Sequence, residues 1–239
     1  MLTPLTTALI RLADAAYRHG TPLLSDAAFD RLSAAHPNAL PPLTGPMLSL
    51  DCMPEPGEWL DRNPGPYVVQ LKADGVSVNL VYVDGRFSHA HLRGGRDVTR
   101  AALAAGALLE LPGSPAGTVE VRCEAIAPNA TRNACAAALR RGTFDFRILL
   151  LAFDLHGIDG ITTQRQSLDW LACAGFGVLA GVLCHTTTEV LAQFDAFLAI
   201  RHTLPFACDG LTVKIDSKAK QRELGCYSRA PRWAISMKP

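Results

Sequence analysis

Residues that could bind phosphate gather in two basic clusters. The stretch 217–239 contains six lysines and arginines against the single acid Glu223, and the stretch 129–141 contains three arginines and no acid. The chain as a whole has 23 Lys and Arg against 22 Asp and Glu, a net charge of +1. Any attraction to polyanions must therefore come from these local clusters, because the overall field gives none.

A lysine, a carboxylate and a glycine stand together at one predicted turn. The sequence K-A-D-G at 72–75 follows one predicted strand and precedes another, so Lys72 and Asp74 lie at the same strand end. Taken alone, such a motif is more often a solvated hairpin lysine than a reactive one. Its interpretation depends on the charged motifs elsewhere in the chain.

Three further segments deliver charges from predicted strands. Glu120, Arg122 and Glu124 share one face of a strand, because side chains alternate with a period of two. Downstream, Asp209 lies at a turn and Lys214 at the far end of the following strand. The last segment alternates apolar and small residues before it ends in Lys238. Charges repeated on otherwise apolar strands indicate a functional site.

The elements that must position these residues alternate in an α+β pattern without regular βαβ spacing. A proline-rich stretch at 36–66 predicts an extended connector, and a helical hairpin precedes it, with Ser25 and Asp26 as an N-cap. Strands are predicted at 67–71, 76–83, 86–92, 118–127, 146–155, 178–184 and 211–215, and helices at 99–109, 164–174 and 187–202. The change of pattern places a domain boundary near residue 44.

Composition excludes several classes of protein. The seven cysteines are odd in number and nowhere spaced C-x-x-C, so neither a disulfide framework nor a zinc ribbon is indicated. The longest apolar run, 170–184, falls short of the ~20 residues that a membrane span needs, and no secretory leader is recognisable. We expect a cytoplasmic protein without membrane contact, and a monomer.

The motifs, taken in order, resemble a known family. K-x-D-G, E-V-R-x-E, R-N-A-x-A-x-x-L-R, D-G-x-x-V-K and A-P-R-W-A-I-x-x-K-P resemble the adenylation domain of bacterial NAD-dependent DNA ligases, a nucleotidyltransferase. The resemblance covers nearly the whole chain. It implies a helical cap that grips the nicotinamide mononucleotide half of NAD, residues 1–44, and an adenylation domain, residues 45–239. The implied core has two twisted, largely antiparallel sheets with the nucleotide in the groove between them.

The resemblance implies that Lys72 attacks the adenylyl phosphorus of NAD and forms lysyl-AMP with loss of nicotinamide mononucleotide. Lys214 and Lys238 would depress the pKa of that amine and stabilise the charge of the transferring phosphoryl group. Asp74 would sit beside the reacting lysine. Asp209 would help to hold Mg²⁺, which prefers oxygen ligands.

The resemblance also implies a set of nucleotide-binding residues. Glu124 would hold the ribose hydroxyls and Gln70 would read the adenine amino group, with a carbonyl where the family usually has a glutamate. Phe153 would stack on adenine; the alternative for an aromatic on a strand is a packing role in the core. The remaining implied contacts to the nucleotide, its phosphates or DNA are Leu71, Gly75, Arg93, Arg132, Arg140 and Arg201.

In the cap, Tyr17, Asp26, Phe29 and Asp30 match positions that bind the nicotinamide mononucleotide moiety. Phe29 replaces a tyrosine, so stacking survives and a hydrogen bond does not.

Cys123 replaces a family glycine, and we expect its side chain to crowd the nucleotide side of the strand.

Three functions remain open from the sequence. The first is NAD-dependent self-adenylation as the first step of sealing nicked DNA. The second is a stand-alone adenylyltransferase that passes AMP from NAD to a small molecule, a protein or water. The third is a module that binds NAD without turnover, and it ranks last because buried charges without their ligand are costly.

Overall fold

The computed structural model describes Ser25, Ala28, Arg31 and residues 47–53, 55–128, 130–143, 146–226 and 230–239. The predicted helical cap therefore lies outside the described residues, apart from Ser25, Ala28 and Arg31. The last two are helical. The cap residues Tyr17, Asp26, Phe29 and Asp30 lie outside the described residues, and their roles stay predictions.

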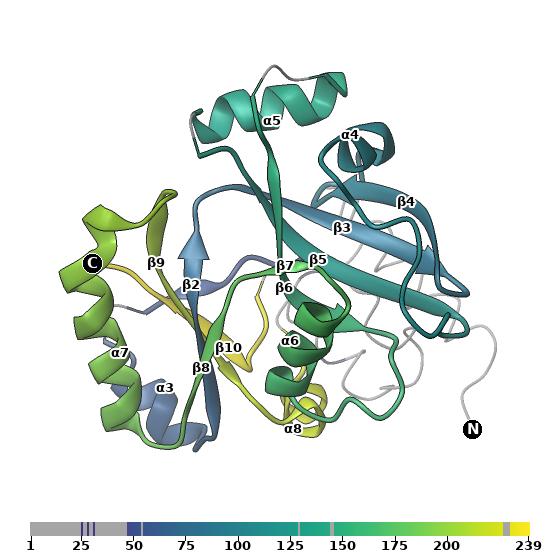
Figure 1. The fold of residues 1–239 in the computed structure, drawn as a ribbon. Coiled ribbons are helices and arrows are strands. Elements are labelled where there is room, and N and C mark those ends of the chain that lie inside the picture. The colour runs from purple at the N-terminus through teal and green to yellow at the C-terminus, as the bar shows by residue number, and fades with distance from the viewer. Residues whose placement is uncertain are drawn as a thin grey trace.

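One sheet, here sheet A, brings together strands from both ends of the described chain. Its order is β1-β10-β9-β2-β8, and every pairing is antiparallel except β1 with β10. The members are β1 (Asp51–Cys52), β2 (Tyr67–Ala73), β8 (Gly181–Cys184), β9 (Cys208–Ile215) and β10 (Ala234–Met237). Two helices, α3 (Gly57–Arg62) and α7 (Thr187–Ile200), cover its outer face, and the short helix η1 (Arg201–Thr203) follows α7 (Figure 1).

The second sheet, sheet B, is built mainly from a meander. Its order is β4-β3-β5-β6-β7, antiparallel except for β6 with β7. The members are β4 (Arg86–Leu92), β3 (Val76–Val83), β5 (Thr118–Ile126), β6 (Leu149–His156) and β7 (Gly177–Val178). The helices α4 (Thr99–Ala104), α5 (Arg132–Arg141) and α6 (Gln164–Cys173) pack on it, and α8 (Lys218–Leu224) follows β9 (Figure 1).

Each sheet has its own apolar core because alternate residues of its strands face opposite sides. On β2, Tyr67 and Val69 pack with α7, whereas Gln70 belongs to the other face. On β3, Val78, Leu80 and Tyr82 pack into the larger core of sheet B. The remaining faces of the two sheets carry the charged and polar residues, and the predicted two-sheet α+β architecture is confirmed.

Two local predictions are corrected. The proline-rich stretch contains the helix α3, because no proline occurs between Pro56, its N-cap, and Pro64. The predicted strand at 178–184 is two strands in different sheets, β7 and β8. The chain crosses between sheets at Leu179, whose N–H donates to Ala152 O of sheet B.

None of the described helices is both long enough and apolar enough to cross a bilayer.

Candidate active site

Lys72, Asp209 and Lys238 form an ion-paired triad. The Lys72 ammonium lies 3.1 Å from Asp209 Oδ1 and donates to Oδ2 at 3.3 Å, and Lys238 Nζ lies 2.7 Å from Asp209 Oδ2. The side chain of Lys72 is 28% exposed, so solvent and a ligand can reach it. The structure thus brings together three residues that are far apart in the sequence.

Strand order explains why the triad forms. Lys72 is near the end of β2, Asp209 near the start of β9, and Lys238 directly follows β10. Because β9 is antiparallel to both neighbours, these three positions meet at the same end of the three central strands of sheet A. The pairing register sets Lys72 opposite Gly210.

Charge pairing shifts the pKa values of two members of the triad, Asp209 and Lys238. Burial alone would raise the pKa of Asp209, but the hydrogen bonds and charges of Lys238 and Lys72 outweigh it and hold that pKa below its usual value. The hydrogen bond to Asp209 in turn raises the pKa of Lys238. At neutral pH the cluster therefore holds one carboxylate between two lysine side chains.

Asp74 and Gly75 form the turn that joins the two sheets. Asp74 N–H donates to Ala207 O at 2.8 Å, and Gly75 O accepts from Arg132 Nε at 2.7 Å. Arg132 Nε also lies 3.5 Å from Asp74 Oδ1. A Cβ at Gly75 would overlap Ala125 O, so only glycine fits where the turn between β2 and β3 approaches β5.

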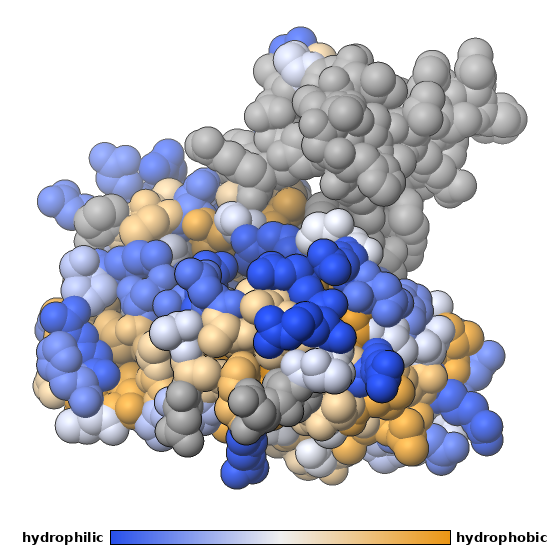
Figure 2. All heavy atoms as spheres, turned by 90° about the horizontal axis from the view of Figure 1, so that it is seen from above, coloured by the Kyte–Doolittle hydropathy of each residue, from blue (hydrophilic) through white to orange (hydrophobic). Residues whose placement is uncertain are grey.

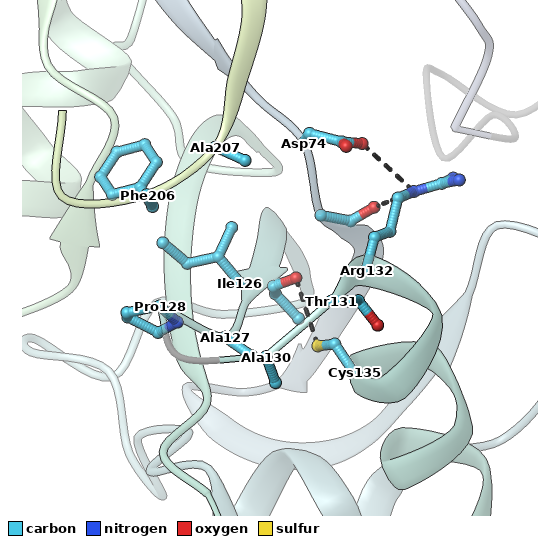
Figure 3. A pocket seen from close by; sticks show the side chains of 12 residues that line it. Asp74, Ile126, Ala127, Pro128, Ala130, Thr131, Arg132, Cys135, Phe206 and Ala207 are labelled. Atoms are coloured by element: carbon cyan, nitrogen blue, oxygen red, sulfur yellow. Dashed lines mark hydrogen bonds and ion pairs between the residues drawn. The ribbon is translucent and has the colours of Figure 1, made fainter. Parts of the chain in front are cut away.

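A pocket of about 260 Å³ opens beside this turn. Figure 3 shows Asp74 and Arg132 joined on one side of it, and Phe206, Ile126 and Pro128 on the other. Figure 2 looks onto the side of the molecule where Figure 1 has α5, and hydrophilic residues gather across the middle of that face. The pocket therefore has an apolar wall and a charged rim.

Glu124 lies next to this turn at the end of β5. Its Oε2 accepts from Ser77 Oγ at 3.0 Å, and Arg93 Nη2 donates to the same hydroxyl at 3.2 Å. Burial raises the pKa of Glu124, although the Ser77 hydrogen bond and the charges of Lys72, Arg93 and Arg132 oppose the shift. These carboxylate and hydroxyl oxygens are acceptors suited to the hydroxyls of a sugar.

Ser49 and Ser77 are site residues that the sequence analysis missed. Arg93 Nη1 donates to Ser49 Oγ at 2.8 Å, so one guanidinium holds both hydroxyls. The register of β3 with β5 pairs Ser77 with Glu124 and could have indicated Ser77 once the strand pairing was known. We find no comparable signal for Ser49.

Gln70 is fully enclosed two residues before Lys72. It is 2% exposed, its Nε2 donates to Leu179 O at 2.6 Å, and its Oε1 has no hydrogen-bond partner among the described residues. A buried acceptor without a donor is costly, so this oxygen suits a ligand N–H. Leu71, between Gln70 and Lys72, packs with the apolar cluster on the α7 side.

Lys214 shares the groove face of sheet A but stands apart from the triad. Its register partner on β2 is Val68, four residues before Lys72, which corresponds to roughly 13 Å along the strand. Lys214 Nζ donates to Phe153 O at 2.8 Å and lies 5.1 Å from the centroid of the Phe153 ring. Burial lowers the pKa of Lys214 to about 8, although the charge of Asp154 opposes the shift.

The structure places the remaining predicted nucleotide-binding residues in three different surroundings. They are Phe153, Arg140 and Arg201. Phe153 is half-buried in a small cluster with Leu179 and Phe206, next to Lys214. Arg140 is exposed in the last turn of α5, and Arg201 Nε donates to His202. The roles given to these three residues stay predictions.

The expectation for Cys123 is corrected. Its side chain is fully buried in the core of sheet B, where its register partners are Val78 and Ala152. Glu124, the next residue, points to the opposite face, because side chains alternate along β5. The cysteine therefore does not crowd the side of the strand that carries Glu124.

The described residues do not build a resident metal site. No group of three or more His, Cys, Asp or Glu side chains in the described part of the chain could hold a metal ion. The carboxylate of Asp209 is engaged by two lysines, and that of Asp74 lies beside Arg132. Asp209 alone does not supply the ligand set of a resident Mg²⁺.

Comparison with known proteins adds a family. Residues 127–239 match the sequence profile described as the NAD-dependent DNA ligase adenylation domain. A DNA ligase of Corynebacterium jeikeium is 33% identical, over 93% of this chain and 42% of the relative. A DNA ligase of Chloroflexus aurantiacus is 32% identical, over 91% of this chain and 42% of the relative. The chain spans about two fifths of the length of these curated relatives.

Solved structures share the fold at low sequence identity. An archaeal ATP-dependent RNA ligase superposes with a TM-score of 0.55 at 13% identity, over 82% of this chain and 48% of that chain. A structure titled Pmar-Lig_PreS3 gives the same TM-score and identity over 91% of this chain and 51% of that chain. The chain therefore shares its two-sheet fold with these two structures.

Proposed function

Since this chain belongs, through residues 127–239, to the NAD-dependent DNA ligase adenylation-domain family, we propose that it accepts an adenylyl group from NAD on Lys72. The observation that carries the proposal is the triad, in which the partly exposed Lys72 and Lys238 both contact the carboxylate of Asp209. An amine beside a second cation, at the edge of a groove, suits attack on a phosphate.

The proposed reaction is a displacement at phosphorus. Lys72 Nζ loses a proton to solvent, and its lone pair forms a P–N bond with the adenylyl phosphorus of NAD. The P–O bond to the bridging oxygen breaks, and nicotinamide mononucleotide leaves with that electron pair. The ammonium of Lys238 stabilises charge on the phosphoryl oxygens, and Asp209 orients both lysines through its two carboxylate oxygens.

The other polar residues hold the nucleotide in this proposal. Glu124 and Ser77 accept hydrogen bonds from the ribose hydroxyls, and Arg93 holds the Ser77 hydroxyl in place by donating a hydrogen bond to it. Gln70 Oε1 accepts a hydrogen bond from the adenine amino group. A Mg²⁺ ion held by the phosphates of NAD would neutralise part of their charge, since such ions commonly bind through one or two carboxylates and substrate phosphates.

The proposal extends to the acceptor of AMP. We propose nicked DNA as the final acceptor when the chain works within a ligase, with Arg132 and the exposed Arg140 available to phosphates. We keep residues 45–239 as the adenylation domain and 1–44 as a nicotinamide mononucleotide-binding cap.

Intact-protein mass spectrometry tests the proposal directly. We expect one adenylyl group to be gained after incubation with NAD and Mg²⁺, and none with ATP. Release of AMP without an adduct would instead favour transfer to water or a small acceptor. An adduct from ATP alone would contradict the assignment of NAD as donor. If neither nucleotide reacts, the remaining hypothesis is a module that binds NAD without turnover.

Replacing Gln70 by methionine tests whether this residue binds the adenine base. We expect the KM for NAD to rise roughly tenfold, about 1.4 kcal/mol, because one hydrogen bond to the base is lost. The matched control is nicotinamide hypoxanthine dinucleotide, which lacks the amino group. The wild-type protein should prefer NAD over this analogue, and Gln70→Met should not. Equal preference in both proteins would show that Gln70 does not contact the base.

A further inference from the structure

A closed chain of hydrogen bonds joins Lys214 to a second buried lysine. The carbonyl of Phe153 accepts from Lys214 Nζ at 2.8 Å and from Gln164 Nε2 at 3.1 Å. Gln164 Oε1 accepts from Lys218 Nζ at 2.8 Å, and Lys218 Nζ donates to Asp154 Oδ1 at 2.7 Å. The chain returns to its start because Asp154 follows Phe153 on β6.

Every member of this network is withdrawn from solvent. Asp154, Gln164, Lys214 and Lys218 are 2%, 0%, 4% and 7% exposed. Buried charges are tolerated only where they are paired and hydrogen-bonded, so such a cluster needs a reason beyond packing. Lys214 lies on the face of sheet A that also carries Gln70 and Lys72, whereas Lys218 belongs to the helix α8 that follows β9.

The backbone locks the two helices that supply the network. Gln164 is the first residue of α6 and Lys218 the first of α8. Lys218 N–H donates to Thr162 O at 2.9 Å, and Gln164 N–H donates to Asp216 O at 2.7 Å. In Figure 1 the helix α8 is drawn just below α6, and the hydrogen bond from Lys218 Nζ to Gln164 Oε1 joins their first residues.

We propose that Lys218, Gln164 and Asp154 are positioning residues for Lys214, which fix its ammonium on the Phe153 carbonyl and set its charge in the nucleotide groove. The proposal rests on the proposed function and on the role that the family resemblance implies for Lys214, which is to assist adenylyl transfer by its charge. None of the three residues touches the triad of Lys72.

The charged neighbours of Lys214 shift its pKa in opposite directions. Burial lowers the pKa of Lys214 to about 8; Asp154 opposes this shift, and Lys218 and Arg122 add to it. Burial would raise the pKa of Asp154, but Lys218, His156 and Lys214 hold it well below its usual value. Among the described residues, the charged groups that act on Lys214 are Asp154 on β6, Lys218 on α8 and Arg122 on β5. His156 Nε2 lies 3.5 Å from Asp154 Oδ2, and α6 adds the neutral Gln164.

Lys218→Met removes one cation and leaves the carboxylate of Asp154 free to act on Lys214. In protein labelled with ¹³C at lysine Cε, the Lys214 resonance, assigned by its loss in Lys214→Arg, should titrate about one pH unit higher than in the wild type. The descending limb of the pH profile for lysyl-AMP formation should move in the same direction, because Lys214 then keeps its proton to higher pH. Lys218→Arg should restore both midpoints.

The matched control is Lys220→Met on the same helix. Lys220 forms an exposed pair with Glu223, so its loss should move neither midpoint. If Lys218→Met does not fold, the double variant Asp154→Asn with Lys218→Met removes both charges. Its Lys214 midpoint should fall below that of the wild type, since Asp154 acts on Lys214 more strongly than Lys218 does.

An unchanged Lys214 midpoint in a folded Lys218→Met protein, or an equal shift in Lys220→Met, would overturn the positioning role. The titration needs no NAD, so it is independent of adenylation. A shifted midpoint together with no adduct in the wild type would refute the proposed function and leave the charge coupling standing.

Discussion

Lys72→Arg is expected to abolish the adenylyl adduct while the protein keeps its fold. Arginine retains a positive charge opposite Asp209, but a guanidinium is not deprotonated in proteins and is no nucleophile. Formation of the adduct from NAD should therefore fall by at least about 10⁴-fold. Intact-protein mass spectrometry measures the adduct, and the thermal midpoint reports on the fold.

Lys220→Arg serves as the control for this substitution, because Lys220 is an exposed lysine outside the triad. It should form the adduct at the wild-type rate. An adduct that persists in Lys72→Arg would assign the covalent bond to another residue, and peptide mapping would then identify it. Lys238 would be the first to examine, since it shares the carboxylate of Asp209.

Gly210→Ala is expected to destabilise the protein by about 3 kcal/mol, the upper end of the usual cost of overpacking. A Cβ at Gly210 would overlap the backbone carbonyl of Met237 and lie 3.3 Å from Lys238 Cα. Backbone atoms cannot move aside as a flexible side chain would, so β9 and β10 must separate. Urea-induced unfolding, followed by circular dichroism, measures the loss.

Gly57→Ala is the matched control for this prediction. No heavy atom lies within 4 Å of a Cβ at Gly57, and its backbone is not in the left-handed region. Its stability should stay the same or rise by up to about 1 kcal/mol, because alanine restricts the unfolded chain. Equal destabilisation by both substitutions would show that the approach of β9 to β10 is not the cause.

The β-hairpin of sheet B could be predicted from the sequence because its signals are local. Asp84 and Gly85 supply the positive backbone angles of the turn, and the flanking residues alternate. The predicted strands 76–83 and 86–92 coincide with β3 and β4. A local pattern of this kind does not depend on partners elsewhere in the chain.

The split of the predicted strand 178–184 could not be read locally. Leu179 donates to Ala152 of sheet B and accepts from Gln70 of sheet A, so the chain changes sheets at this residue. Propensity identifies extended backbone but does not choose its partner. The helix α8 was missed, since its seven residues are too short for a clear apolar period.

The candidate site followed from motifs, but its geometry required the strand order. Family resemblance assigned Lys72, Asp209 and Lys238 to one reaction, and the order β10-β9-β2 places their side chains in contact. The same motifs did not indicate that Lys214 is held by Phe153 and by a network from α6 and α8. Such contacts depend on tertiary packing, which no local window of sequence contains.

The position of β10 in sheet A has a consequence for synthesis on the ribosome. β10 lies between β1 and β9, and its register joins Asp51 to Ile235. Lys72 and Lys238 are 166 positions apart (238 − 72), so at translation rates of about 5–20 residues per second roughly 8–33 s separate their synthesis. Through that interval the growing chain carries Lys72 without Lys238, and for most of it without Asp209. The ion-paired triad is completed only when almost the whole of this segment has left the exit tunnel.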